Sequence, residues 1–168
     1  VDRHNPRPGL RRWIAVNRRV EHTSDWAAAW ASVHHDGSVT LACAVGGRRD
    51  GPNSKASLNT IEGRTIECAV SDVMGLIRSA SSHFGTSEYE VRVGIEPSRG
   101  VGIPDPIVIR GADQHGFVYD GTSLRLAKYS PVSVTVTADA SDLDFHWQVH
   151  DLARDCINQG GLANVSLI

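Results

Sequence analysis

Residues 65–84, TIECAVSDVMGLIRSASSHF, decide the class of fold to which this chain belongs. Apolar side chains recur there at spacings of three and four, which places them in one stripe along an α-helix. Gly85 is a suitable residue to end such a helix. Gly75 lies inside it and costs about 1 kcal/mol relative to alanine, a cost that close packing against a sheet would explain. We predict a helix over residues 65–84 whose core stripe is Ile66, Val70, Val73, Ile77, Ala80 and Phe84.

Segments that alternate between apolar and polar residues flank this helix and predict strands. In residues 89–95, YEVRVGI, the odd-numbered side chains point inward, and Glu90 and Arg92 point outward. Residues 30–34 and 39–45 predict a hairpin, because Asp36-Gly37 suits a two-residue turn. Residues 46–59 are polar and glycine-rich and are expected to be a loop. Further strands are expected at 13–20, 107–109, 116–119, 124–129 and 132–137, with a short closing strand at 165–168.

A second long helix begins at Ser141, where Ser141 and Asp144 resemble a capping box. Phe145, Val149, Leu152 and Cys156 follow on one face, and Gly160-Gly161 ends the helix. Strands in runs, interrupted by two long helices, predict an α+β fold: an antiparallel sheet with both helices packed on one face.

The composition describes an ordinary globular domain. The chain has 168 residues, of which 40% are hydrophobic and 21% charged, with a net charge of −2. This length favours a single α+β domain over residues 13–168, preceded by an Arg/Pro-rich linker over residues 1–12. No apolar stretch approaches the ~20 residues of a membrane helix. Three cysteines (Cys43, Cys68 and Cys156) lie far apart among apolar neighbours, which indicates buried thiols in a reducing, cytoplasmic compartment.

Arginines gather near the start of the chain, where residues 1–19 hold six of them against one acid, Asp2. A solvated linker is the simpler interpretation, and an arm that contacts phosphates is the alternative. The loop GGRR, residues 46–49, lacks the Lys-Ser/Thr of a P-loop and does not lead into a helix. The candidate nucleic-acid-binding residues are Arg11, Arg12, Arg18, Arg19, Arg48 and Arg49.

His146 and His150 are four residues apart on the second helix, a spacing that suits two metal ligands. Trp147 stands where a zinc protease needs its general-base glutamate, so that class is excluded. A third ligand would come from Asp142 or His34. A polar helix face is the simpler interpretation.

Nucleophilic catalysis has little support. No Gly-x-Ser-x-Gly motif occurs, and Cys68 and Cys156 lie on or beside apolar stripes. The tryptophans are expected in the core or at a subunit interface; they are Trp13, Trp26, Trp30 and Trp147.

Several strings carry a family resemblance: VHHDGSV (33–39), IE-x-AV-x-D-x-M (66–74), YEVRVGIE (89–96), Y-x-PV (129–132) and DC-x-NQGG (155–161). Together they resemble the C-terminal region of actinobacterial multidomain proteins whose N-terminal part is a Schlafen/AlbA-type nucleic-acid-binding domain, often labelled ATP-binding. The resemblance covers nearly the whole chain. It implies that the nucleic-acid or nucleotide residues lie in the N-terminal domain, and that residues 1–12 join the two parts.

With no catalytic constellation in view, the leading interpretation is a non-catalytic C-terminal assembly or regulatory module of a nucleic-acid-associated cytoplasmic protein. It needs no cofactor, and its expected partner is a second copy or another domain of the same protein, with nucleic acid bound through the N-terminal region and no membrane contact. Two alternatives stay open. One is a metal-dependent hydrolase using His146 and His150, and the other is direct nucleic-acid binding through the arginine-rich leader.

Overall fold

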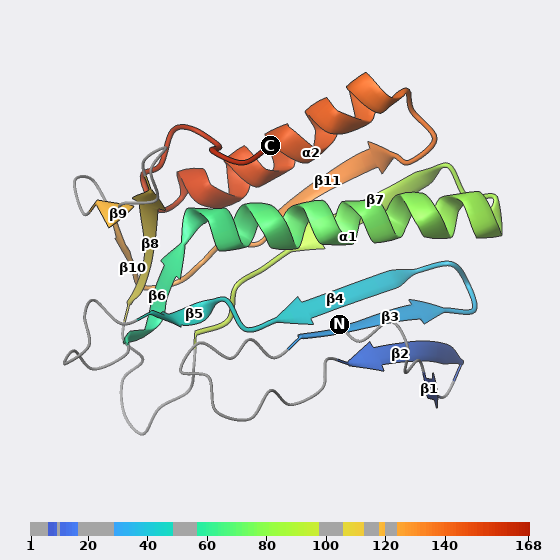
Figure 1. Ribbon diagram of the computed structural model, residues 1–168, viewed down its shortest axis with the longest axis horizontal. Coiled ribbons are helices and arrows are strands. Elements are labelled where there is room, and N and C mark those ends of the chain that lie inside the picture. Colours follow the sequence, from blue (N-terminus) through green and yellow to red (C-terminus); the bar gives the residue numbers. More distant parts are fainter. Residues whose placement is uncertain are drawn as a thin grey trace.

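The computed structural model describes residues 7–9, 11–16, 29–48, 57–97, 106–112, 118–119 and 124–168 (Figure 1). These residues form an α+β fold in which α1 (Gly63–Phe84) and α2 (Asp142–Asn158) pack against small, mostly antiparallel sheets. The predicted fold class is therefore confirmed. Neither of these helices is long and apolar enough to cross a membrane.

The described strands form three sheets. The first is antiparallel in the order β1-β2-β3-β4, with bounds Arg7–Gly9, Arg12–Val16, Ala29–His34 and Val39–Cys43. The second has the order β10-β8-β6-β5, with β9 paired to β8. Its bounds are Arg125–Leu126, Ile107–Ala112, Ser57–Glu62, Gly46–Arg48 and, for β9, Val118–Tyr119. The third pairs β7 (Glu88–Val93) with β11 (Val132–Thr137).

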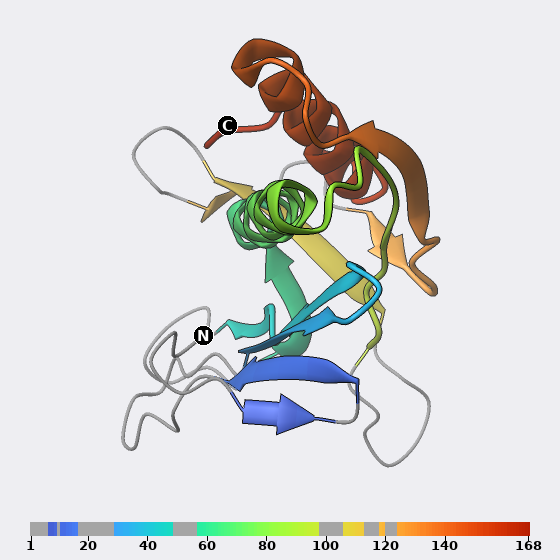
Figure 2. The same cartoon turned by 90° about the vertical axis from the view of Figure 1, so that its right-hand side faces the viewer.

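The expected single antiparallel sheet is replaced by these three smaller sheets, and β6 and β8 run parallel to each other. Helix α1 contacts β4 as well as β6 and β8, so it lies between groups of strands instead of on one face of a single sheet. Figure 2 shows α1 nearly end-on, with β4 on one side and α2 and β11 on the other. Alternation in a sequence identifies strands, but it does not say which strands are neighbours.

Three segments differ from the sequence-based expectations. Residues 7–9, within the segment expected to be a linker, pair with β2. The expected loop 46–59 contributes β5 and the start of β6, where the polar residues Asn59 and Thr60 are buried. Tertiary pairing overrides local composition there, as is common for strands. Residues 165–168 form no strand and pack along α1 instead.

The β3–β4 hairpin is confirmed, but its loop has three residues instead of two. Gly37 N donates to His34 O at 3.0 Å, and His34 N donates to Ser38 O at 2.8 Å. Gly37 has a φ of 84°, which a side chain rarely tolerates. Asp36 accepts hydrogen bonds from the amide and hydroxyl of Ser38, which lower the pKa of its carboxyl group. The loop is thus a turn followed by a glycine bulge.

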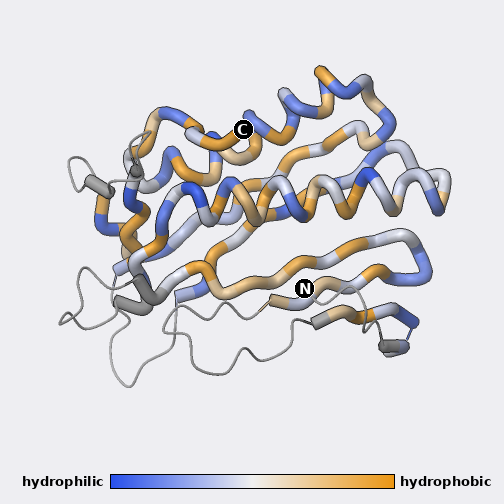
Figure 3. Tube along the Cα trace, viewed as in Figure 1, coloured by the Kyte–Doolittle hydropathy of each residue, from blue (hydrophilic) through white to orange (hydrophobic). Residues whose placement is uncertain are grey.

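Helix α1 follows most of the predicted stripe: Ile66, Val70, Ile77 and Ala80 are buried, whereas Val73 is half-buried and Phe84 is exposed, so its predicted core position is wrong. Figure 3 shows the apolar residues of the helix recurring among polar ones. Gly85 ends the helix with a φ of 71°, and its amide donates to Ser81 O at 2.8 Å. Gly75 was expected to pack closely against a sheet, which is wrong: it is exposed, and a Cβ added there would meet nothing within 4 Å.

Helix α2 is anchored to α1 at its first turn. Ser141 caps it by accepting from Asp144 N at 3.2 Å, as the sequence predicts. Arg78 of α1 donates to Asp142 Oδ1 at 2.8 Å and to Ala140 O at 3.0 Å. The same guanidinium lies 4.6 Å from the ring centroid of Phe145. Because the Asp142 side chain is almost fully exposed, packing contributes more here than the ion pair does.

A buried carboxylate holds the C-terminal segment against α1. The Glu67 side chain projects from the helix at 2% exposure. It accepts hydrogen bonds from Leu167 N at 2.7 Å and from Ser166 N at 3.0 Å and 3.1 Å. The Ser166 hydroxyl adds a longer bond of 3.3 Å. Hydrogen bonds to an ionised acceptor are the strong class, so this cluster fixes the end of the chain to the helix.

Glu67→Gln should lower the free energy of unfolding by about 1–3 kcal/mol, because the amide nitrogen would face backbone donors that it cannot satisfy. Urea denaturation measures the change. Glu90→Gln, at an exposed strand position, is the matched control and should change stability by less than about 0.5 kcal/mol. Equal changes in the free energy of unfolding for the two substitutions would contradict the role given to Glu67 in holding the C-terminal segment.

Candidate functional site

The candidate metal ligands do not converge on a common point. The rings of His146 and His150 both contact the Trp147 ring edge-on, with centroids 5.7 Å and 5.5 Å from it. Asp142 is paired with Arg78, and the Nε2 atom of His34 lies 3.4 Å from Ser32 Oγ. Across the described ranges, no group of three or more His, Cys, Asp or Glu side chains could hold a metal ion. The alternative of a metal-dependent hydrolase therefore gains no geometric support.

The candidate nucleic-acid-binding arginines are only partly described. Arg11 is exposed, and its backbone has a φ of 56° while its carbonyl accepts from His35 N. Arg12 is half-buried in β2, and Arg48 belongs to β5. Arg18, Arg19 and Arg49 lie outside the described residues. Arg11 lies in the turn before β2 and Arg12 begins that strand, whereas Arg48 belongs to a different sheet, so their grouping on one surface stays a prediction.

The predicted burial of the thiols is right for Cys156 alone. Cys43 and Cys68 are exposed. Cys68 lies on the face of α1 away from its stripe, and Cys43 is the last residue of β4. Burial raises the pKa of Cys156 to about 11. Partial burial, with the charge of Asp72, raises the pKa of Cys43. Neither thiol has the lowered pKa of an activated nucleophile.

Two of the tryptophans are not core residues. Trp13 is 54% exposed and Trp147 is 52% exposed. Trp30 is half-buried in β3, and Trp26 lies outside the described residues. An interface at Trp13 or Trp147 stays a prediction.

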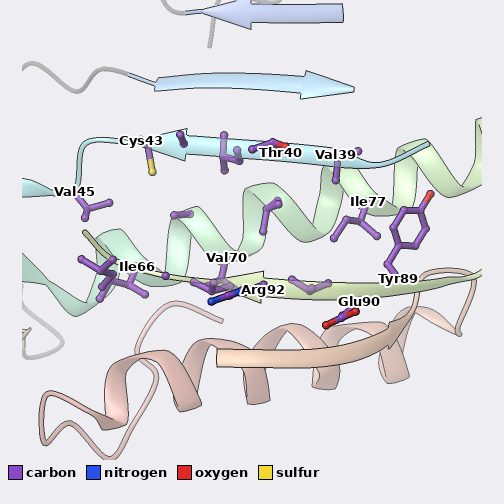
Figure 4. Close-up of a pocket in the computed structure, with 18 of the residues that line it drawn as sticks. Val39, Thr40, Cys43, Val45, Ile66, Val70, Ile77, Tyr89, Glu90 and Arg92 are labelled. Atoms are coloured by element: carbon purple, nitrogen blue, oxygen red, sulfur yellow. The ribbon is translucent and has the colours of Figure 1, made fainter. Parts of the chain in front are cut away.

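A cleft of about 610 Å³ lies where β4, α1 and β7 meet (Figure 4). One wall is β4 with its extension to Val45, and the other is β7 with its extension to Glu96. The floor is the apolar face of α1, formed by Ile66, Ala69, Val70, Val73 and Ile77. A volume of this size falls within the ~300–1,000 Å³ of typical ligand pockets.

The wall formed by β4 presents backbone hydrogen-bonding groups to the cleft. The bond from His34 N to Ser38 O makes these two residues a hydrogen-bonded pair. Such pairs alternate along an antiparallel ladder with pairs whose N–H and C=O groups point away from the partner strand. The β3–β4 register then directs the backbone groups of Val39, Leu41 and Cys43 away from β3.

The wall formed by β7 is its counterpart. Ala138 N donates to Ser87 O at 2.7 Å, which fixes the phase of the β7–β11 ladder. The backbone groups of Glu88, Glu90 and Arg92 therefore point away from β11. Figures 1 and 4 show that this edge of β7 faces the edge of β4, and that both strands run in the same direction. Within the described ranges, no strand pairs with either edge.

The outer edge of β11 and the residues before it are covered by the amide groups of two glutamines, one within α2 and one at its C-terminal cap. Gln148 accepts from Thr137 N at 2.7 Å and donates to Thr137 O at 3.3 Å. Gln159 makes the same pair of contacts with Ser130, at 2.9 Å and 2.8 Å. Each side-chain amide makes the pair of hydrogen bonds that the backbone of a neighbouring strand would make. This fold thus protects one edge of the β7–β11 sheet with side chains and presents the other to the cleft.

The floor of the cleft is apolar and its walls offer main-chain donors and acceptors, the combination that accepts an added β-strand. Cys43 is the thiol in its lining, and the pKa of that thiol is raised. The five residues of β4 would span about 17 Å of such a strand.

The sequence did not predict this cleft. It predicted β4, β7 and the α1 stripe, and it placed Glu90 and Arg92 outward, as the structure confirms. It did not identify the cleft, because whether a strand lies at an edge depends on pairing and not on its own residues. Val73 and Ala69 of α1 are only half-buried, which marks where the cleft lies. No pattern in the sequence predicts this partial exposure.

The chain matches no protein-family model, no curated protein and no solved structure.

The raised pKa of Cys43 predicts slow alkylation. At pH 8 a Cys68→Ser variant should react with iodoacetamide more slowly than a small-molecule thiol of ordinary pKa, because less thiolate is present. Its rate should keep rising at pH values above 9.0, the ordinary value of the thiol. Asp72→Asn in the same background should lower the pKa and raise the rate at pH 8, whereas the distant Asp139→Asn should leave it unchanged. Equal rates in all three proteins would contradict this electrostatic assignment.

Proposed function

We propose that this domain is a non-catalytic assembly or regulatory module that binds an extended segment of a partner polypeptide in the cleft between β4 and β7. One observation carries the proposal: two strand edges with outward-pointing backbone groups face each other across an apolar helix face. Unpaired edges are templates for strand addition, and proteins normally cover them. Two such edges beside an apolar floor favour a cleft that is filled by a bound strand.

The proposed cellular context of this domain is supported by the family resemblance and not by the cleft. The family resemblance of residues 33–39, 66–74, 89–96, 129–132 and 155–161 supports a nucleic-acid-associated, cytoplasmic protein. In that setting the segment bound in the cleft belongs to another chain or to another domain of the same protein. The thiols with raised pKa and the unconverged histidines give no support to a catalytic role.

Selection from a phage-displayed library of random ten-residue peptides tests the proposal on the 168-residue chain. We expect the recovered peptides to alternate between apolar and polar residues, as a strand over an apolar floor requires. Ala69→Phe fills the cleft from its floor and should weaken their binding by about tenfold or more, the equivalent of 1.4 kcal/mol.

The matched control is Ser79→Phe, which places the same ring at an exposed position of α1 outside the cleft lining. It should bind the recovered peptides as the parent chain does, and thermal melting should show that both variants are folded. Recovery of no peptide, or of peptides that bind all three proteins equally, would rule the proposal out.

A further inference from the structure

Two opposite charges stand beside the gap between β4 and β7, where no described strand lies; this gap is called the vacant strand position. Glu90 and Arg92 project from β7 on the face away from α1, and both are exposed. Their cross-strand neighbours on β11 are the neutral residues Thr135 and Ser133. Among the described residues, neither charge has an ion-pair partner. The charges that would complement them are therefore absent from the β11 side.

The direction of the walls restricts the direction of an inserted strand. Because β4 and β7 run the same way (Figure 4), a strand between them is antiparallel to both or parallel to both. Antiparallel pairing is the more stable per residue. Along an antiparallel strand the residue opposite Arg92 comes first, and the residue opposite Glu90 follows two positions later. The side chain between these two faces α1.

A buried hydroxyl also lacks a partner at this site. Tyr89 lines the cleft, and its Oη is buried without a hydrogen-bond partner in the described part of the chain. Figure 4 shows the ring at one end of the cleft, beside Val39 and Ile77. A buried polar atom without a partner is unfavourable. A polar group on a bound segment would relieve this cost.

We propose that the occupant is a strand of a different protein, with the order acidic, apolar, basic, inserted antiparallel to β4 and β7 and hydrogen-bonded to both. Its acidic residue lies opposite Arg92, its basic residue opposite Glu90, and its apolar residue contacts the half-buried floor residues Ala69 and Val73. The strand joins the β1–β4 sheet and the β7–β11 sheet into one. This inference rests on the proposed function and adds the chemistry and direction of the partner.

Two capped seven-residue peptides of identical composition test the order. One reads threonine, valine, glutamate, valine, lysine, valine, threonine, and the other exchanges glutamate and lysine. Cross-strand charge pairs are individually modest, so two of them predict that the glutamate-first peptide binds roughly two- to thirtyfold more tightly. Isothermal titration calorimetry measures both affinities.

The double variant Glu90→Lys/Arg92→Glu should invert this preference, because it exchanges the charges at two exposed positions and leaves the apolar floor of the cleft unchanged. Equal affinities of the two peptides would overturn the charge order, as would tighter binding of the lysine-first peptide to the parent chain. If both bind equally and Ala69→Phe removes their binding, the proposed function stands and this inference fails. If the phage selection also yields no cleft-dependent peptide, both fail.

N-methylation of the glutamate-first peptide tests whether the strand contacts both walls. Successive amides of an inserted strand point alternately to β4 and to β7, so methylation at each of three consecutive central positions should weaken binding by about fivefold or more, the loss of one hydrogen bond. Loss only at alternate positions would show pairing with a single wall and overturn the bridging strand.

Sedimentation that shows a dimer abolished by Ala69→Phe would assign the cleft to a second copy and overturn the proposal.

Tyr89→Phe gives a readout that a purely structural role would not move. It removes a buried hydroxyl without a partner, so the thermal midpoint of the ligand-free domain should stay the same or rise. Affinity for the glutamate-first peptide should nevertheless fall by about two- to tenfold, the worth of one hydrogen bond. A lower midpoint with unchanged affinity would overturn the role given to this hydroxyl.

Discussion

The structure depends on side-chain packing around α1, because no ladder of hydrogen bonds among the described strands joins the β1–β4 sheet to the β7–β11 sheet. Helix α1 contacts β4, β6, β8 and α2, and α2 in turn contacts β11. The core cluster is correspondingly centred on α1 residues such as Val70, Met74 and Ile77. The β1–β4 sheet is therefore held by α1, and the β7–β11 sheet by α2 and by the core cluster to which both helices contribute.

The ends of α1 and α2 are fixed by polar contacts that leave the cleft side of α1 unaffected. Glu67 binds Ser166 and Leu167 near the start of α1. Arg78 binds the first turn of α2 near the end of α1. Both contacts orient α2 and the C-terminal segment on one side of the helix. The opposite side, with Ala69 and Val73, is left to form the floor of the cleft.

Under the proposed function, this arrangement would make strand binding specific. Main-chain groups on β4 and β7 would recognise any extended segment, and the α1 face would select apolar side chains at alternate positions. Glu90 and Arg92, beside the gap between the two strands, would then add selectivity through their charges. Charges also discourage indiscriminate pairing of an exposed edge. The same two residues would therefore provide both selectivity and protection.

The sequence predicted those features that depend on local periodicity. The α1 stripe from Ile66 to Ala80, the helix end at Gly85, the Ser141 cap and the strand 132–137 all follow from spacing and capping chemistry, and the structure confirms them. The exception is Phe84, which is exposed. Strand β6 was missed because its burial of Asn59 and Thr60 depends on pairing with β8 and not on its own polar residues.

The candidate site was missed for a related reason. A vacant strand position is a property of two strands that are far apart in the sequence and adjacent in space. Exposure of Cys43 and of Gly75 was likewise mispredicted, because apolar neighbours in the chain do not determine which face of an element is covered.

Residue-resolved amide hydrogen exchange tests the central claim, that the edges of β4 and β7 are open and accept a strand, most directly. In the ligand-free domain, the amides of Thr40, Ala42, Tyr89, Val91 and Val93 should exchange slowly because they bond to β3 or β11. Those of Val39, Leu41, Cys43, Glu88, Glu90 and Arg92 should exchange fast. Addition of the glutamate-first peptide should slow the fast set on both strands. Protection of that set before any peptide is added, or no change after it, would contradict the account.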